Sequence, residues 1–299
     1  MNKQTKSITL QKRSLSLFLS LVIALGLIIS IPQPVMAGNG VKRLINGKTV
    51  TTTLTGSKKH NVRCTVKNTY KNEYEEKLNF SLYIDGKAVY TYKSPSYEVF
   101  QDFADVWLLE INNNTKLIWV WIGFADPHST TELKIFSYSD GKLRMCGDIK
   151  KLVGVEKCGW EFGAYPEKAG NNKLVTTIHR QVSSIGNHEE IATFNYSASK
   201  NKVSRASNIN EVSLPYTSGW DVTWYDNWGT VIKSFNTYTK AGGKTLSFIA
   251  RIGEYLRVQR VTYLNGALYF EVKNVQGKVG WYKEQKKWDP YFNEAVFGN

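Results

Sequence analysis

Three tryptophans, Trp220, Trp224 and Trp228, recur at every fourth position of the segment 219–229. On a helix this spacing would stack the rings along one face, but the β-branched pair inside the segment and its flanking glycines favour a strand or loop. On a strand the even spacing puts all three rings on one side. Partly exposed tryptophan rings with a wet polar end can serve as stacking platforms for sugars. The competing interpretation is that the three rings fill the seam between two domains.

Five more aromatic residues follow these tryptophans, and they could line a peptide groove or simply cover a small barrel. Together with the three tryptophans we take them as candidate ligand-binding residues: Tyr238, Tyr263, Tyr269, Trp281 and Tyr282.

Catalytic patterns are weak. His188, Glu189 and Glu190 begin like the helix of a zinc protease, but Ala192 stands where the second histidine should be. No nucleophile elbow or phosphate-binding loop occurs. A cysteine-peptidase interpretation needs a cysteine that opens a helix, whereas Cys64 lies in a strand-like run. We therefore predict no catalytic residue, no metal ligands and no cofactor.

The paired carboxylates Asp102 and Asp105 are explained more simply as aspartates of a turn or strand end.

The three cysteines allow two interpretations. Eleven residues lie between Cys146 and Cys158, and a bridge would close a small loop for about 2–3 kcal/mol. Cys64 would then remain unpaired. The alternative is three buried thiols.

The elements that must position these residues read as strands. Asp85-Gly86, Asp140-Gly141 and Asn265-Gly266 each lie between β-rich runs, which is the strongest local signal for a hairpin. A further hairpin is expected to turn at residues 112–114, and residues 149–153 are expected to form one short helical turn. The fold class predicted is all-β.

The first 37 residues have the parts of a secretory signal. A basic start is followed by a seventeen-residue apolar run, then by two prolines and by a site for cleavage before Gly38. The alternative is a membrane anchor, because the run is at the lower limit of a membrane-spanning length. After cleavage we expect no membrane span, so the sequence predicts a secreted protein.

Charge and composition set further limits on the partners. The chain has 299 residues and a formal charge of +14; without the four basic residues of the leader, 35 basic and 25 acidic residues leave +10. This charge favours anionic partners outside the cell, while export argues against nucleic acid. We expect peptidoglycan or another anionic envelope polymer, with the oligomeric state left open.

The mature chain is expected to have three parts. Residues 38–60 resemble a flexible arm in composition, and residues 61–215 are predicted to form an antiparallel β domain. A boundary is placed near Pro215, after a polar and weakly periodic stretch. Residues 216–299 form the last part, where 18 of 84 residues are aromatic, a larger share than in residues 38–215.

Residues 237–284 contain a strand near 245–249, the run 253–258, the Asn265-Gly266 hairpin, the alternating strand 268–273, and a closing Gly277-Lys278-Val279-Gly280-Trp281. With this pattern they resemble a bacterial SH3-like domain. Gly277 and Gly280 are expected to adopt the positive φ of a tight turn. The resemblance implies a small barrel, surrounded by aromatic-rich flanks, that binds peptidoglycan or its peptides.

In residues 78–146 an Asp-Gly hairpin, the segment 102–105, a strand and a second Asp-Gly hairpin follow each other, and residues 160–205 repeat the pattern weakly. With this pattern residues 78–146 resemble a blade of an integrin-like or calcium-loop β-propeller. Asn112, Asn113 and Asn114 occupy the turn where that family has closely spaced aspartates. Two partial blades cannot close a propeller, so a sandwich or open sheet with blade-like hairpins is expected.

These patterns predict a noncatalytic binding protein at the cell envelope, whose SH3-like barrel binds wall peptide or glycan. A secreted hydrolase that acts on the wall or on carbohydrate is the alternative. A third possibility is a module that binds a protein partner through its N-terminal sheet.

Overall fold

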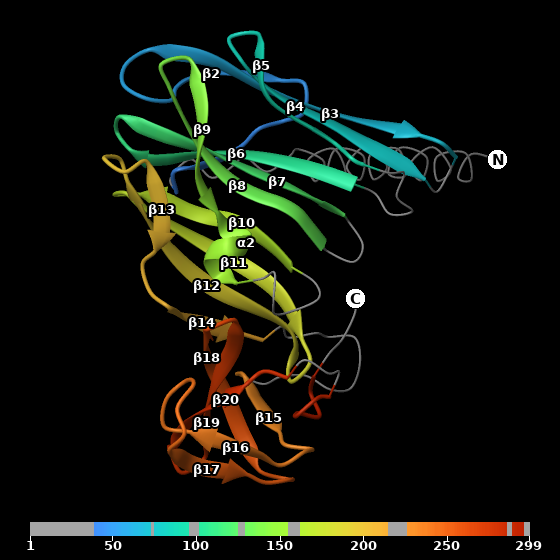
Figure 1. Cartoon of the computed structure of the whole chain (residues 1–299), viewed down its shortest axis with the longest axis vertical. Helices are drawn as coiled ribbons and strands as arrows, with labels where there is room; N and C mark the ends of the chain where they lie inside the picture. The colour runs from blue at the N-terminus through green and yellow to red at the C-terminus, as the bar shows by residue number, and fades with distance from the viewer. Residues whose placement is uncertain are drawn as a thin grey trace, which may run out of the picture. The chain divides into compact units, whose positions relative to one another are not determined.

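We describe the chain from a computed structural model (Figure 1). The structure describes residues 39–72, 75–95, 102–124, 129–154, 162–214, 226–285 and 289–295. Residues 38–299 form one compact unit. The expected leader at residues 1–37 and the boundary at Pro215 lie outside the described residues.

Twenty strands and one short helix make up the described part of the chain. The strands of its first half are β1 (Val41–Arg43), β2 (Thr49–Thr53), β3 (Lys59–Tyr70), β4 (Glu76–Ile84), β5 (Lys87–Lys93), β6 (Asp102–Asn112), β7 (Thr115–Phe124), β8 (Ser129–Ser139) and β9 (Lys142–Asp148). The helix α2 (Ile149–Val153) and the remaining strands follow: β10 (Phe162–Gly170), β11 (Lys173–Val182), β12 (Gly186–Ser197), β13 (Lys202–Arg205), β14 (Ile209–Ser213), β15 (Trp228–Thr230), β16 (Phe235–Tyr238), β17 (Leu246–Ala250), β18 (Tyr255–Leu264), β19 (Ala267–Asn274) and β20 (Val279–Lys283).

The all-β prediction is confirmed, and every strand pairing described is antiparallel. The strands form a four-stranded sheet β2-β3-β4-β5, a five-stranded sheet β1-β6-β7-β8-β9 and an eleven-stranded sheet that begins β10-β11-β12 and ends β20-β16-β17 (Figure 1). Each is an open path of strands in the part of the chain described here.

The Asp-Gly and Asn-Gly hairpins form as predicted. Asp85-Gly86 joins β4 to β5, Asp140-Gly141 joins β8 to β9, and Asn265-Gly266 joins β18 to β19. In each pair both residues have φ between 51° and 79°, the left-handed geometry of a two-residue hairpin whose twist matches its strands. The expected turn between β6 and β7 and the short helix α2 are also present.

The arm expected at residues 38–60 is instead built into the sheets. Val41–Arg43 pairs with β6, and Thr49–Thr53 pairs with β3. Leu44 and Leu54 are 4% and 0% exposed, so the few apolar residues of this polar stretch anchor it in the core. Composition alone misses this because a polar edge strand needs only occasional apolar contacts.

The five-stranded sheet is apolar on both faces. Alternate residues of β6 and β7, such as Leu108 and Ile118, pack against the β2–β5 sheet. Their neighbours, such as Leu109 and Trp119, pack with residues of β10, β11 and β12. Burial on both faces explains why β6 and β7 read as continuous apolar runs rather than as alternating ones.

The C-terminal strands enclose a third core. Leu256, Val258, Phe270 and Tyr282 are among its buried residues, and Phe235 stacks on Tyr291 with ring centroids 4.5 Å apart. Because β14 pairs with β18, the strands of this core continue the sheet that starts at β10.

A buried ionic cluster lies between the core beside α2 and the core of the C-terminal strands. Arg180 on β11 contacts the ring of Phe162, which belongs to the core beside α2. His188 on β12 meets the ring of Phe270 from the C-terminal core edge to face, with centroids 5.3 Å apart. Both side chains contact Glu190, so one carboxylate connects the two cores.

Among the described residues, no helix has the length and apolar character needed to cross a membrane.

Candidate functional site

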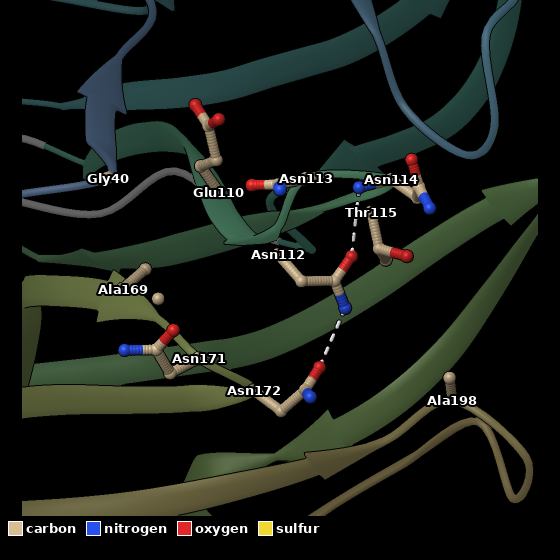
Figure 2. Close-up of a pocket in the computed structure, with 11 residues that line it drawn as sticks. Gly40, Glu110, Asn112, Asn113, Asn114, Thr115, Ala169, Asn171, Asn172 and Ala198 are labelled. Atoms are coloured by element: carbon tan, nitrogen blue, oxygen red, sulfur yellow. Dashed lines mark hydrogen bonds between the residues drawn. The ribbon is translucent and has the colours of Figure 1, made fainter.

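An open groove of about 810 Å³ runs along the turns that join the first strands of the sheets (Figure 2). Its lining comes from the β6–β7 turn, the β10–β11 turn, the start of the described chain and the segment after β12. The residues that line it are Gly40, Glu110, Asn112, Asn113, Asn114, Thr115, Ala169, Gly170, Asn171, Asn172 and Ala198.

Two asparagines cross-link the turns. The Nδ2 of Asn112 donates to the Oδ1 of Asn172 at 2.6 Å, and the amide N of Asn114 donates to the Oδ1 of Asn112 at 3.0 Å (Figure 2). The backbone N of Asn172 also donates to the carbonyl of Ile111 at 2.8 Å. These bonds fix the β6–β7 turn against the β10–β11 turn.

The third hairpin of this end joins the same frame. The N of Gly56, in the β2–β3 turn, donates to the carbonyl of Asn114 at 2.9 Å, and Thr55 forms an isolated bridge with Thr115. The turns of the β2–β3, β6–β7 and β10–β11 hairpins thus meet at one end of the sheets.

The start of the described chain forms one wall of the groove. The carbonyls of Asn39 and Gly40 accept from the N of Ala169 and the N of Glu110, each at 2.7 Å. Gly40 has φ of +71°, and a Cβ there would lie 2.1 Å from the Ala169 carbonyl oxygen. Only glycine allows the two backbones to approach this closely.

The polar side chains of the groove are mainly asparagine amides, and its net charge is small. Five of its residues are asparagines, and each amide group offers two donors and one acceptor. Its one carboxylate, on Glu110, lies 3.4 Å from the Nζ of Lys116. Such a lining suits a neutral ligand with many hydroxyl or amide groups better than an ion.

A second surface lies on β15 and β18. The rings of Trp228 and Tyr255 stack with centroids 6.4 Å apart and planes 25° apart. Trp228 is partly exposed and Tyr255 is 50% exposed. Cross-strand pairing places Trp228 opposite Arg257, whose Nη2 donates to the Oδ1 of Asp226 at 2.7 Å.

A smaller polar cavity of about 350 Å³ adjoins this aromatic pair through Arg257. It is lined by Glu211, Val212, Asn227, Arg257, Gln259 and Arg260. The Oδ1 of Asn227 accepts from the N of Leu214 at 2.9 Å, which holds the start of β15 against the end of β14.

The structure separates the candidate aromatic residues into three groups. Trp220 and Trp224 lie outside the described residues. Trp228, Tyr238, Tyr263 and Tyr269 are all half-buried, and the ring of Tyr263 lies against Gly154 at the end of α2. Trp281 and Tyr282 are 8% and 2% exposed, and rings buried to this extent offer no open face for stacking in this conformation.

Sequence reasoning missed Tyr255 and the asparagine groove. No sequence pattern singles out Tyr255, because it follows a turn and lies outside the tryptophan-rich run. The groove joins residues 39–40 to residues 110–115 and 169–172, and only the pairing of the strands brings them together. The Asn-rich turns were the one available signal.

His188 and Asp105 make ionic contacts within the fold. Nε2 of His188 lies 3.2 Å from Oε1 of Glu190, and on the neighbouring strand Nδ1 of His179 lies 3.4 Å from Oε1 of Glu189. Asp105 pairs with Arg43. No cluster of three or more His, Cys, Asp or Glu suited to a metal ion occurs among the described residues.

The half-buried carboxyl group of Glu284 lies at the contact between the β11–β12 turn and β20. The N of Ser184 donates to Oε1 of Glu284 at 3.2 Å, and its hydroxyl donates to Oε2. Ser184 Oγ also lies 2.9 Å from the hydroxyl of Tyr282. Burial raises the pKa of Glu284 to about 7, against the lowering effect of these hydrogen bonds.

Cys64 and Cys146 are free and buried. The thiol of Cys146 lies 3.4 Å from the carbonyl of Ile135, and burial raises its pKa to about 12. Cys158 lies outside the described residues, so a bridge between Cys146 and Cys158 stays a prediction.

No family model matches this chain, and neither a curated protein nor a solved structure matches it.

Proposed function

We propose that this protein is a secreted, noncatalytic binding protein of the bacterial cell envelope, and that its C-terminal strands hold wall glycan. The observation that carries the proposal is the stacked, partly exposed pair of Trp228 and Tyr255. A flat aromatic surface can cover the apolar face of a sugar ring, while the neighbouring polar groups bind its hydroxyls.

The groups beside the pair suit that role. Arg257 and Asp226 form an exposed ion pair, and Asn227, Gln259 and Glu211 line the adjoining cavity. They present both hydrogen-bond donors and acceptors next to the rings. Trp220 and Trp224 precede Trp228 closely in the chain and are candidates to extend the aromatic surface.

The family resemblances remain part of this proposal. An SH3-like arrangement of β16 to β20 accords with the strand order β18-β19-β20-β16-β17 and with the core that these strands enclose. A blade-like arrangement of the N-terminal part accords with its successive meanders β2–β5, β6–β9 and β10–β13. The leader-like residues 1–37 and the basic charge support a place outside the cell, at an anionic envelope.

The direct test is cosedimentation of residues 38–299 with purified insoluble peptidoglycan. We expect retention at low salt, and we expect Trp228→Ala or Tyr255→Ala to weaken binding about tenfold, since each removes one stacking face. Tyr70→Ala is the matched control, because Tyr70 is 63% exposed on β3 and belongs to another sheet. Absence of retention, or equal retention of all variants, would reject the proposal.

A further inference from the structure

We infer that the asparagine-lined groove is a second binding site, specific for a neutral hydroxyl-rich chain such as an oligosaccharide. It is built from the turns of β6–β7 and β10–β11 and from residues 39–40, whereas the surface around Trp228 lies on β15 and β18. This inference goes beyond the proposed function, because the groove binds whether or not the aromatic pair does.

The groove combines fixed and open amides. Asn112 and Asn172 bond to each other and to the backbone, so they form its frame. Asn113, Asn114 and Asn171 are exposed, and no hydrogen bond joins their side-chain amides to another described residue. Three amide groups therefore point from a fixed frame with their donors and acceptors open to a ligand.

The frame orders the backbone that carries these amides before any ligand binds. Asn171 and Asn172 adopt φ of 53° and 59°, the left-handed conformation that asparagine tolerates best after glycine. Backbone hydrogen bonds from Ala169 to Asn39 and from Gly56 to Asn114 hold the adjoining walls. A site whose backbone is already ordered loses little entropy on binding.

The chemistry of the lining selects the ligand. A sugar hydroxyl both donates and accepts, and a side-chain amide can meet two neighbouring hydroxyls with its donor and its acceptor. Glu110 is balanced by Lys116, so the lining offers no uncompensated charge for an ion. A volume of about 810 Å³ is in the range of small-molecule sites, roughly 300–1,000 Å³.

With two separate sites on one chain, the N-terminal sheets would have a binding role of their own. Binding at one site raises the effective concentration of the same polymer at the other, so overall attachment exceeds either affinity.

The test is a titration of residues 38–299 with chitotetraose, a neutral oligosaccharide, followed by ¹H–¹⁵N NMR. We expect the side-chain amide signals of Asn113, Asn114 and Asn171 to shift with one common saturation curve. The double variant Asn113→Ala with Asn171→Ala should weaken the remaining Asn114 response at least tenfold. Asn236→Ala, an exposed asparagine on β16, is the matched control and should change nothing.

Two further outcomes separate this inference from the proposed function. Trp228→Ala should abolish the shifts around Tyr255 and leave those of the groove amides intact. Groove amides that do not shift up to 20 mM chitotetraose, or that shift equally in the double variant, would overturn the inference, whatever the indole signal of Trp228 does. Shifts in the groove without any at Trp228 would support the groove and count against the aromatic surface.

Discussion

The Nε of Arg180 lies 2.8 Å from the Oε1 of Glu190, and both side chains are almost fully buried. The same carboxylate accepts from Nδ2 of Asn210 at 2.9 Å and lies 3.2 Å from His188. The pair thus joins β11, β12 and β14 at the meeting point of two cores. Burial alone would raise the pKa of Glu190, but the charge of Arg180 together with His188 and Asn210 lowers it to about 2.

We predict that Glu190→Gln destabilises the protein by about 3 kcal/mol, because it removes the negative charge that Glu190 places beside the buried Arg180 guanidinium. Urea unfolding followed by tryptophan fluorescence measures this change. Glu211→Gln on β14, an exposed residue, is the control and should cost less than about 0.5 kcal/mol. Equal stability of both variants would show that the buried pair contributes nothing.

The low pKa of Glu190 also predicts sensitivity to acid. A carboxyl whose folded pKa is lowered stabilises the fold above its unfolded pKa, which is about 4.5, and this contribution is lost as the pH falls through the folded value of about 2. The loss is on the order of 3 kcal/mol over that interval. Thermal melts between pH 2 and 5 should show a steep fall in Tm for the wild type and a smaller one for Glu190→Gln. Parallel plots of Tm against pH for the two proteins would contradict this prediction.

Glu284 should give the stability of the fold a pH dependence opposite to that from Glu190. Its folded pKa of about 7 exceeds the unfolded value of 4.5, so its contribution is complete below about pH 4.5 and is lost as the pH rises through 7. The groups around it are the Ser184 hydroxyl and two tyrosines, Tyr282 and Tyr291, whose pKa values are raised by burial and by the charge of Glu284.

We expect the free energy of unfolding to drop by on the order of 3 kcal/mol between pH 4.5 and 7.5 from this one group, and Glu284→Gln to remove that drop. Urea titrations at four pH values measure it. Glu211→Gln, a substitution at an exposed position of β14, should leave the profile unchanged. A Glu284→Gln profile identical to that of the wild type would disprove the assignment.

A substitution at Gly40 tests the close approach of two backbone segments. Gly40→Ala would force a Cβ to 2.1 Å from the Ala169 carbonyl at a φ of +71°. We expect the free energy of unfolding to fall by about 3 kcal/mol or more, because backbone strain and steric overlap both destabilise the variant. Gly47 has φ of +76° with nothing within 4 Å of its Cβ position, so Gly47→Ala isolates the backbone strain and should cost about 1 kcal/mol. Similar melting temperatures for the two variants would contradict the close approach.

Local chemistry made much of the fold predictable. Asp85-Gly86, Asp140-Gly141 and Asn265-Gly266 turn as their residue types require, because a two-residue hairpin of type I′ needs two positive φ angles. Gly277 has the expected φ of +84°. Gly280 does not belong with it: a Cβ there would lie 2.4 Å from the Oγ1 of Thr237, so the position needs glycine for space rather than for its φ.

Long-range pairing was not predictable. Val41–Arg43 pairs with Trp107–Leu109, and the Nδ2 of Asn112 meets Asn172 sixty residues away. No short-range pattern encodes such contacts, since they depend on how whole sheets stack. The ion pair of Arg180 and Glu190 is equally hard to predict, because its surroundings form only through the pairing of β11, β12 and β14.

The cysteines give a last prediction, on chemical reactivity. Only the thiolate reacts readily with iodoacetamide, and burial raises the pKa of the thiols of both Cys64 and Cys146. We expect neither to be alkylated in the folded protein at pH 8 within an hour, and both to react fully in denaturant under reducing conditions. Ser199→Cys places a thiol at an exposed turn and serves as the reactive control. Peptide mapping by mass spectrometry reads each site and, without reductant, shows whether Cys146 is joined to Cys158. Rapid alkylation of Cys64 or Cys146 in the folded protein would mean that the strands covering them open far more often than their burial implies.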